Sequence, residues 1–266
     1  MYRKLTEVYK TIEENKKNIE VLPTGLGMLD ADLDGGFLKK ELVVLGGKTG
    51  GGKSLFGSTI FYNVAKTGQK CAYFSLEISD EMLVSRLVGA EANLSPTRVM
   101  ITHLEELDQA KANEAKADIS VYEELMHFYD DVYELDKIQK EIRDNKYDFV
   151  VIDFIQNIID TTKKDEYERL SFISLELQRL AKSENCCLLV LSQLSNRIAY
   201  DKTKDKEIVE YKGSGSIATV CDLGFFIENG ETDKDFCLRL RKNRRGISGQ
   251  EYYFRLQTPG GRIISK

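Results

Sequence analysis

The chain has 266 residues, of which 42% are hydrophobic and 30% are charged, a composition that excludes a largely disordered protein. The 38 lysines and arginines against 43 acidic residues give a net charge of −5, which excludes a uniformly basic protein that coats nucleic acid. No stretch has the apolar length needed to cross a bilayer, and the start carries no apolar signal region. We therefore expect a cytoplasmic protein without a membrane partner.

The first 18 residues predict a short amphipathic helix. Leu5, Val8 and Ile12 fall near one helical face, and lysines and glutamates occupy the other positions. A helix this short is marginal alone, so we expect it to dock on its own domain or on a neighbouring subunit. We accordingly divide the chain into a linker helix, 1–18, and a globular domain, 19–266.

From about residue 21 the sequence alternates short apolar runs with amphipathic helical stretches. Each run is apolar at nearly every position, as is typical of the buried strands of a parallel sheet. They are Leu42–Leu45, Cys71–Ser75, Phe149–Ile152, Leu188–Leu191 and Leu223–Ile227. This order predicts an α/β fold, with a mostly parallel twisted sheet and helices on both faces. Residues 236–241 and 251–256 alternate in polarity and predict an antiparallel C-terminal extension at one sheet edge.

The strongest motif runs from Gly47 to Ser54 and fits G-x-x-x-x-G-K-[ST] between a strand and a helix. Glycines let backbone amides close around phosphate oxygens, and the helix N-terminus adds a favourable dipole. The lysine of such a P-loop reaches the β- and γ-phosphates, and the hydroxyl after it ligates magnesium. We expect ATP and Mg²⁺ at Gly47, Lys48, Thr49, Gly50, Gly51, Gly52, Lys53, Ser54 and Leu55.

Three polar side chains follow other predicted strands. Asp153 ends a wholly apolar strand, where a carboxylate faces the ligand crevice; with Ser54 it is the predicted metal ligand, directly or through water. Glu77 is a candidate base for the attacking water, and Gln193 is a neutral amide that can hydrogen-bond to the γ-phosphate. Taken alone, Glu77 and Gln193 also fit ordinary polar residues after a strand.

A basic turn, residues 241–246, joins the two alternating runs near the end of the chain. It fits an ordinary solvated hairpin tip. It equally fits an arginine finger that is supplied to phosphate either in cis or from a neighbouring subunit.

In this order the motifs resemble the DnaB-type replicative helicases, which are RecA-like ring ATPases. The similarity covers nearly the whole chain and rests on the P-loop with Tyr73–Ser79, Val151–Gln156, Leu191–Leu194, Gly213–Ile217 and Lys242–Gly246. It implies a RecA-like P-loop fold and a hexameric, ATP-hydrolysing motor of DNA replication. Such a motor translocates 5′ to 3′ on single-stranded DNA and unwinds duplex, with a helicase loader and primase as partners, in a bacterial or phage-infected cell.

The resemblance also implies roles for the residues of the ATP site. Lys53 and Ser54 hold phosphates and magnesium, and Asp153 supports the metal. Glu77 is the catalytic base. Gln193 couples the γ-phosphate to the loops that contact DNA.

Two further groups of residues gain roles only through the resemblance. Arg244 is the finger donated to the ATP of the next subunit, with Lys242 beside it. Lys212, Gly213 and Gly215 contact the backbone of single-stranded DNA in the ring channel. Gly213 departs from the family, which commonly has an acidic residue there.

Two other classes of function stay open. One is a RecA- or RadA-like recombination or repair ATPase that depends on DNA but does not unwind it, and the other is a P-loop module that binds ATP without DNA-stimulated turnover. The resemblance further implies that the chain opens at the family's linker and lacks its N-terminal primase-binding domain. We therefore expect either a truncated chain or a naturally short form.

Overall fold

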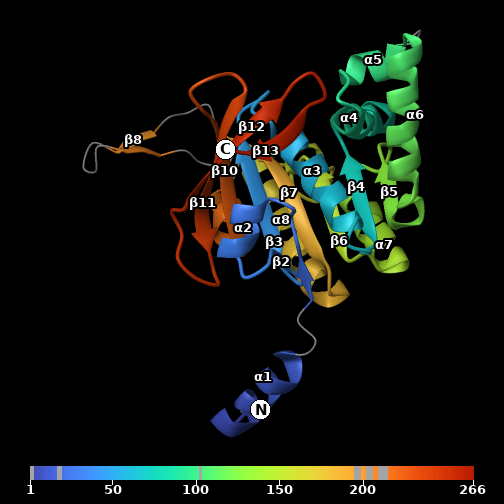
Figure 1. Cartoon of the computed structure of the whole chain (residues 1–266). Coiled ribbons are helices and arrows are strands. Elements are labelled where there is room, and N and C mark those ends of the chain that lie inside the picture. Colours follow the sequence, from blue (N-terminus) through green and yellow to red (C-terminus); the bar gives the residue numbers. More distant parts are fainter. Residues whose placement is uncertain (1–2, 17–19, 102–103, 195–198, 202–205, 209–214) are drawn as a thin grey trace.

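The computed structural model describes residues 3–16, 20–101, 104–194, 199–201, 206–208 and 215–266. The strands of its main sheet are β3 (Leu42–Gly47), β4 (Cys71–Ser75), β5 (Met126–Tyr129), β6 (Phe149–Asp153), β7 (Cys187–Gln193), β10 (Leu223–Asn229), β11 (Asp235–Asn243), β12 (Glu251–Gln257) and β13 (Arg262–Ser265). This nine-stranded sheet has the order β13-β12-β11-β10-β3-β7-β6-β4-β5 (Figure 1). All five predicted apolar runs lie in its strands.

The sheet combines a parallel part with an antiparallel extension. From β10 through β3, β7, β6 and β4 to β5, every neighbouring pair is parallel. The strands β11, β12 and β13 add to β10 in antiparallel pairs. The predicted α/β class and the predicted C-terminal extension are therefore both confirmed.

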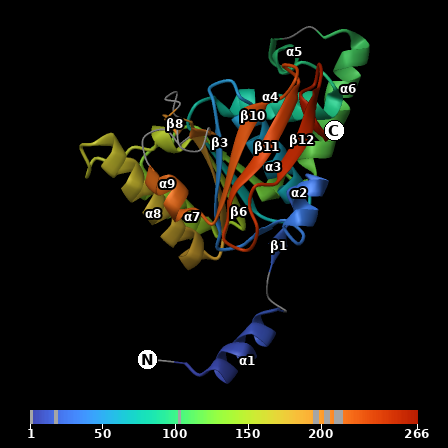
Figure 2. The ribbon, with the colours of Figure 1, turned by 90° about the vertical axis from the view of Figure 1, so that its left-hand side faces the viewer.

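Helices pack on both faces of the sheet. One face carries α2 (Gly27–Asp32), α3 (Lys53–Ala65), α4 (Asp80–Ala92), α5 (Pro96–Ile101) and α6 (Glu106–Ser120), and the other carries α7 (Leu135–Asn145), α8 (Glu166–Glu184) and α9 (Gly215–Val220). Alternate residues of a strand supply the two cores, since Val43 packs on the first side and Val44 on the second. Figure 2 shows α8 and α9 together on one side of the sheet and α2 on the other.

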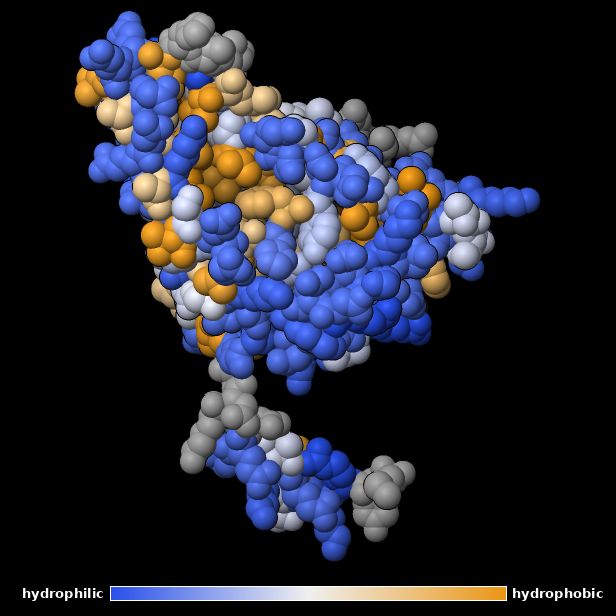
Figure 3. Space-filling model, turned by 90° about the vertical axis from the view of Figure 1, so that its right-hand side faces the viewer, coloured by the Kyte–Doolittle hydropathy of each residue, from blue (hydrophilic) through white to orange (hydrophobic). Residues whose placement is uncertain are grey.

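Short elements complete the fold. Strands β1 (Val21–Leu22) and β2 (Phe37–Leu38) form one small antiparallel sheet, and β8 (Ala199–Asp201) and β9 (Lys206–Ile208) form another. The 3₁₀ turns are η1 (Glu123–Leu125) and η2 (Ile155–Asn157). On the side of the molecule that carries α4, α5 and α6, apolar side chains gather in a hollow with hydrophilic surroundings (Figure 3).

The N-terminal helix α1 (Leu5–Lys16) stands apart from the rest of the described chain (Figures 1 and 2). Its apolar side chains are open to solvent: Leu5 is 65% exposed, Tyr9 57% and Ile12 46%. The predicted helix is present, and its docking partner stays a prediction. Within the described residues, no helix combines the length and the apolar character that crossing a membrane requires.

Candidate nucleotide-binding site

The P-loop connects β3 to α3 at the carboxyl edge of the parallel sheet. Gly50 and Gly52 have φ values of 72° and 88°, which lie in the region that favours glycine. A Cβ atom on Gly51 would lie 2.9 Å from the carbonyl oxygen of Lys48. Gly52 is the N-cap of α3, and no side chain of the described residues caps this helix end, so its first backbone amides are left for a ligand to pair with. The predicted strand, turn and helix are confirmed here.

Lys53 lies at the bottom of this loop and is 7% exposed. Its Nζ donates hydrogen bonds to the carbonyl oxygens of Gly47, at 3.1 Å, and Lys48, at 3.0 Å. Burial lowers the pKa of Lys53, and the nearby carboxylates of Asp153 and Glu77 act in the opposite direction. The charged amine is thus held among oxygen atoms, as a group that binds phosphate oxygens requires.

Asp153 ends β6 and is fully buried. Its Oδ2 accepts a 3.0 Å hydrogen bond from the hydroxyl of Tyr73 on the neighbouring strand β4. Its Oδ1 is buried and has no hydrogen-bond partner among the residues that the structure describes. Burial is the main cause that raises the pKa of Asp153; Glu77 raises it further, whereas the nearby Ser54 hydroxyl and the hydrogen bond from Tyr73 lower it. The structure therefore places both predicted metal ligands, Ser54 and Asp153, side by side.

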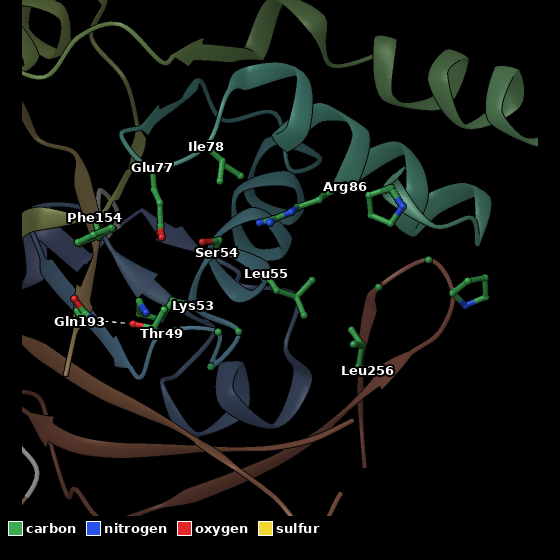
Figure 4. A pocket seen from close by; sticks show the side chains of 17 residues that line it. Thr49, Lys53, Ser54, Leu55, Glu77, Ile78, Arg86, Phe154, Gln193 and Leu256 are labelled. Atoms are coloured by element: carbon green, nitrogen blue, oxygen red, sulfur yellow. Dashed lines mark hydrogen bonds between the residues drawn. The ribbon is translucent and has the colours of Figure 1, made fainter. Parts of the chain in front are cut away.

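Two more of the predicted residues reach the same site. Glu77 follows β4, and its carboxylate points toward Ser54 and Lys53 (Figure 4). Gln193 is the last residue of β7, and its amide Nε2 donates a 2.6 Å hydrogen bond to Oγ1 of Thr49 in the P-loop (Figure 4). Residues from β4, β6 and β7 thus meet the loop after β3, because the carboxyl ends of parallel strands share one sheet edge.

The P-loop residues from Thr49 to Leu55 line a cavity of about 580 Å³, together with Glu77 and Gln193. Helix α4 adds Arg86, which points toward Ser54 in Figure 4. The remaining lining residues are Ile78, Pro96, Phe154, Leu256, Pro259, Gly260 and Gly261. Sequence reasoning missed this wall. Ile78 and Phe154 lie in stretches that carry the family resemblance, but nothing local connects the turn after β12 with a P-loop so far away in the sequence.

Lys242 and Arg244 do not line this cavity. Their neighbour Asn243 pairs with Leu223, which in turn pairs with Val43 near the start of β3. The P-loop begins at the other end of that strand, where Gly47 pairs with Ile227. The backbone rises by four residues from Val43 to Gly47, which is about 13 Å along β3. Within one chain, the basic turn and the nucleotide cavity therefore lie toward opposite ends of the strands β3 and β10.

The two arginines of the basic turn have different surroundings. Arg245 forms a 3.0 Å ion pair with buried Glu41 and donates to the carbonyl oxygens of Leu33 and Gly36 at 3.2 and 3.0 Å. Arg244 is more open, with its side chain 44% exposed, and forms a 2.9 Å ion pair with Asp222. The contacts of Arg245 thus stabilise the fold around Glu41.

Of the predicted DNA contacts, Gly215 is the exposed first residue of α9. Lys212 and Gly213 lie outside the described residues.

The family described as "DnaB-like helicase C terminal domain" matches residues 21–257. A "Probable replicative DNA helicase" from Trieres chinensis is 30% identical over 261 residues, which cover 90% of this chain and 57% of that protein. "Replicative DNA helicase DnaC" from Bacillus subtilis is 29% identical over 235 residues, which cover 84% of this chain and 51% of that protein. The chain thus spans about half the length of the curated relatives it matches.

Two solved structures show the same fold. One, described as an ATPase domain, superposes with a TM-score of 0.82 at 21% identity, over 98% of this chain and 97% of its own. "The Structure Of A DnaB-Like Replicative Helicase And Its Interactions With Primase" gives 0.84 at 18% identity and covers 99% of this chain and 67% of its own. The family match favours a helicase over the RecA- or RadA-like alternative. The chain belongs to the DnaB-like helicase C-terminal domain family.

Proposed function

We propose that this chain is the ATP-driven motor of a replicative DNA helicase, which translocates 5′ to 3′ on single-stranded DNA and unwinds the duplex ahead of it. One observation carries the proposal within this family. Lys53 and Glu77 come from two separate segments and line one cavity, and Asp153 of a third segment is buried close to both of them. This set provides a phosphate cradle, a metal ligand and a base.

The residues at this edge fit a magnesium–nucleotide complex. Hard oxygen ligands suit Mg²⁺, and next to the Ser54 hydroxyl Asp153 has a buried Oδ1 without a hydrogen-bond partner in the described part of the chain. Ser54 and Asp153 would hold the ion, directly or through water. When bound, Mg²⁺ neutralises negative charge on the phosphates and orients them.

The side chains of the cavity divide the hydrolysis of ATP among them. The oxygen of the attacking water forms a bond to the γ-phosphorus as the bond to the bridging β–γ oxygen breaks and ADP leaves. Glu77 takes the proton of that water. Lys53 and the amides of the P-loop stabilise the charge that develops on the phosphate oxygens. Gln193, which holds Thr49, connects the loop to the end of β7.

Assembly completes the site in this proposal. Because Lys242 and Arg244 lie toward the opposite end of β3 and β10 from their own cavity, they would serve the cavity of the next chain in a hexameric ring. We assign α1 to the linker helix that docks on a neighbouring copy, since its apolar side chains are exposed. Single-stranded DNA would contact Lys212, Gly213 and Gly215, and a loader and primase are the proposed partners in the cytoplasm of a bacterial or phage-infected cell.

The test combines ATP turnover with strand displacement. The chain should hydrolyse ATP faster with single-stranded DNA, and it should open a forked duplex that has a free 5′ tail. Turnover that DNA stimulates without any displacement would point to a recombination-type ATPase. ATP binding with no DNA-stimulated turnover would point to a binding module, and either result contradicts the proposal.

A further inference from the structure

Lys242 and Arg244 are bound to the C-terminus of helix α9 within their own chain. Nζ of Lys242 donates to the carbonyl oxygens of Ala218, at 2.8 Å, and Thr219, at 2.6 Å. A guanidinium nitrogen of Arg244 donates to the Thr219 carbonyl oxygen at 3.0 Å, and the other nitrogen pairs with the Asp222 carboxylate at 2.9 Å. The last carbonyls of a helix lack intrahelical partners and carry negative partial charge, so two cations cap this end favourably.

Asp222 connects this capped end to the nucleotide-binding strand. Its Oδ2 accepts a 3.0 Å hydrogen bond from the backbone N–H of Leu42 at the start of β3. Its backbone N–H donates to the Leu42 carbonyl at 2.8 Å, and its carbonyl accepts from the N–H of Arg244 at 3.0 Å. Asp222 is thus fixed in place by the sheet, and it presents Oδ1 to the guanidinium group.

The same cations are the ones that the proposed function assigns to the neighbouring chain's ATP. A lysine or arginine side chain cannot cap α9 and contact a distant phosphate group at once. The contact with Asp222 is half open to solvent on the arginine side, where exchange costs little free energy. The N-terminus of α9 is Gly215, a predicted DNA contact. The six-residue helix is only about 9 Å long.

We propose that Asp222 and the carbonyls of Ala218 and Thr219 form a finger seat, which holds Lys242 and Arg244 in reserve until α9 shifts. Asp222 is a positioning residue in this inference, which rests on the proposed function. Occupation of the seat and engagement with the next chain's nucleotide exclude each other. A ligand that displaces α9 therefore favours release of the cations. By linkage, release of the cations makes α9 easier to displace.

The test compares two aspartates with matched contacts. Asp222→Asn removes the charge that attracts Arg244 and keeps an oxygen for the Leu42 N–H. Asp148→Asn is the control, because Asp148 also accepts a backbone hydrogen bond, from Lys70 at 2.8 Å, and pairs with a cation, Lys39 at 2.8 Å, yet it contacts no finger residue. ATP turnover is measured for each variant with and without single-stranded DNA.

We expect Asp222→Asn to raise DNA-independent turnover by about two- to fivefold, the range that a partly exposed ion pair of about 0.5 to 1 kcal/mol allows. The DNA-stimulated rate stays as in the unmodified chain, so the stimulation ratio falls by the same factor. Asp148→Asn keeps both rates. If Asp222→Asn matches Asp148→Asn, or lowers both rates equally, the seat is only structural and the inference is wrong. If the unmodified chain shows no DNA-stimulated turnover, the proposed function fails as well.

A second measurement applies even where Asp222→Asn does not fold. Affinity for a fluorescent single-stranded oligonucleotide is measured without nucleotide for Arg244→Ala. A finger that acts only on ATP leaves this affinity equal to that of Arg179→Ala, which removes the same charge from an exposed position on α8. The finger seat instead predicts about two- to fivefold tighter binding, because Arg244→Ala removes part of the contact that single-stranded DNA must break to displace α9. Equal affinities would contradict the inference.

Discussion

The side-chain amide of Gln193 donates a 2.6 Å hydrogen bond to the hydroxyl of Thr49, and so ties the end of β7 to the phosphate-binding loop. The backbone N–H of Gln193 also donates to the side-chain oxygen of Gln156, at 3.2 Å, in the turn after Asp153. Gln193 therefore links the P-loop with the segment that follows Asp153.

This link predicts that Gln193→Ala lowers ATP turnover by at least about tenfold, because a neutral donor beside the phosphates is lost. Binding of a fluorescent ATP analogue should change less than about threefold, since Lys53 and the loop amides remain to hold the phosphates. Gln109→Ala, an exposed amide on α6, serves as the control. An equal loss of binding and turnover would assign Gln193 to the loop's structure alone.

Asp153→Asn is expected to stabilise the nucleotide-free chain by about 0.5 to 2 kcal/mol at pH 7, because it removes a buried carboxylate. Burial raises the pKa of Asp153 in the folded chain. The stability that its neutral form contributes is present at acid pH and is lost as the pH rises through the raised pKa. The gain from the variant should therefore grow as the pH rises above about 4, the ordinary pKa of an aspartate, in urea unfolding experiments.

The same variant should lose the thermal stabilisation that Mg²⁺ and ATP confer on the unmodified chain. A variant that is less stable than the unmodified chain at neutral pH would show that another contact compensates the buried charge.

Glu77→Gln should lower turnover by about 10²- to 10⁴-fold, because an amide cannot accept the proton of the attacking water. The polar group stays the same size, so ATP binding should persist. Single-turnover phosphate release and equilibrium binding separate the two effects. Glu123→Gln, at an exposed position in η1, is the control. Turnover near the unmodified rate would exclude Glu77 as the base.

Mixing Arg244→Ala with Lys53→Ala should restore ATP turnover that each variant lacks alone. An interface works again when a chain with an intact P-loop receives the finger of the other variant. In a random equimolar ring, about one quarter of the interfaces have this arrangement. Turnover is measured as the mixing ratio varies, and a flat response would argue against a finger that acts between chains.

Arg245→Ala should destabilise the chain by about 2 to 3 kcal/mol, since it removes the partner of buried Glu41 and two hydrogen bonds to carbonyls. Arg244→Ala should cost less than about 1 kcal/mol, because its ion pair is partly exposed. Urea unfolding of both variants tests this contrast between adjacent residues. Equal losses of stability would contradict the stabilising role of Arg245.

Much of this architecture could be predicted from local patterns. A continuous apolar run that ends in a polar residue is sufficient to place Asp153 at the end of a buried strand. The P-loop pattern fixes its own turn, because glycines occupy positions with positive φ. Both signals are contained within short, continuous stretches of sequence.

What could not be predicted depends on contacts between distant segments. Tyr73 donates to Asp153 across 80 residues, and only strand register brings the two together. The turn with Pro259 reaches the cavity because β13 folds back beside α3 and Phe254 of β12 packs on Phe56 of that helix. The sequence of the basic turn fits a finger that acts in cis as well as one that acts in trans. Only the pairing of β10 with β3 and β11 shows that Arg244 lies away from its own cavity.

That separation has a consequence for how copies of the chain associate. If the surface with Arg244 contacts the nucleotide cavity of the next chain, then the two contacting surfaces differ. A twofold dimer cannot form both contacts in every chain. Association would then be head to tail, and it would close into a ring or continue as an open helix depending on the rotation between neighbours. Each added copy would create one new working site, so that ATP turnover per chain would rise with protein concentration until every finger has a partner.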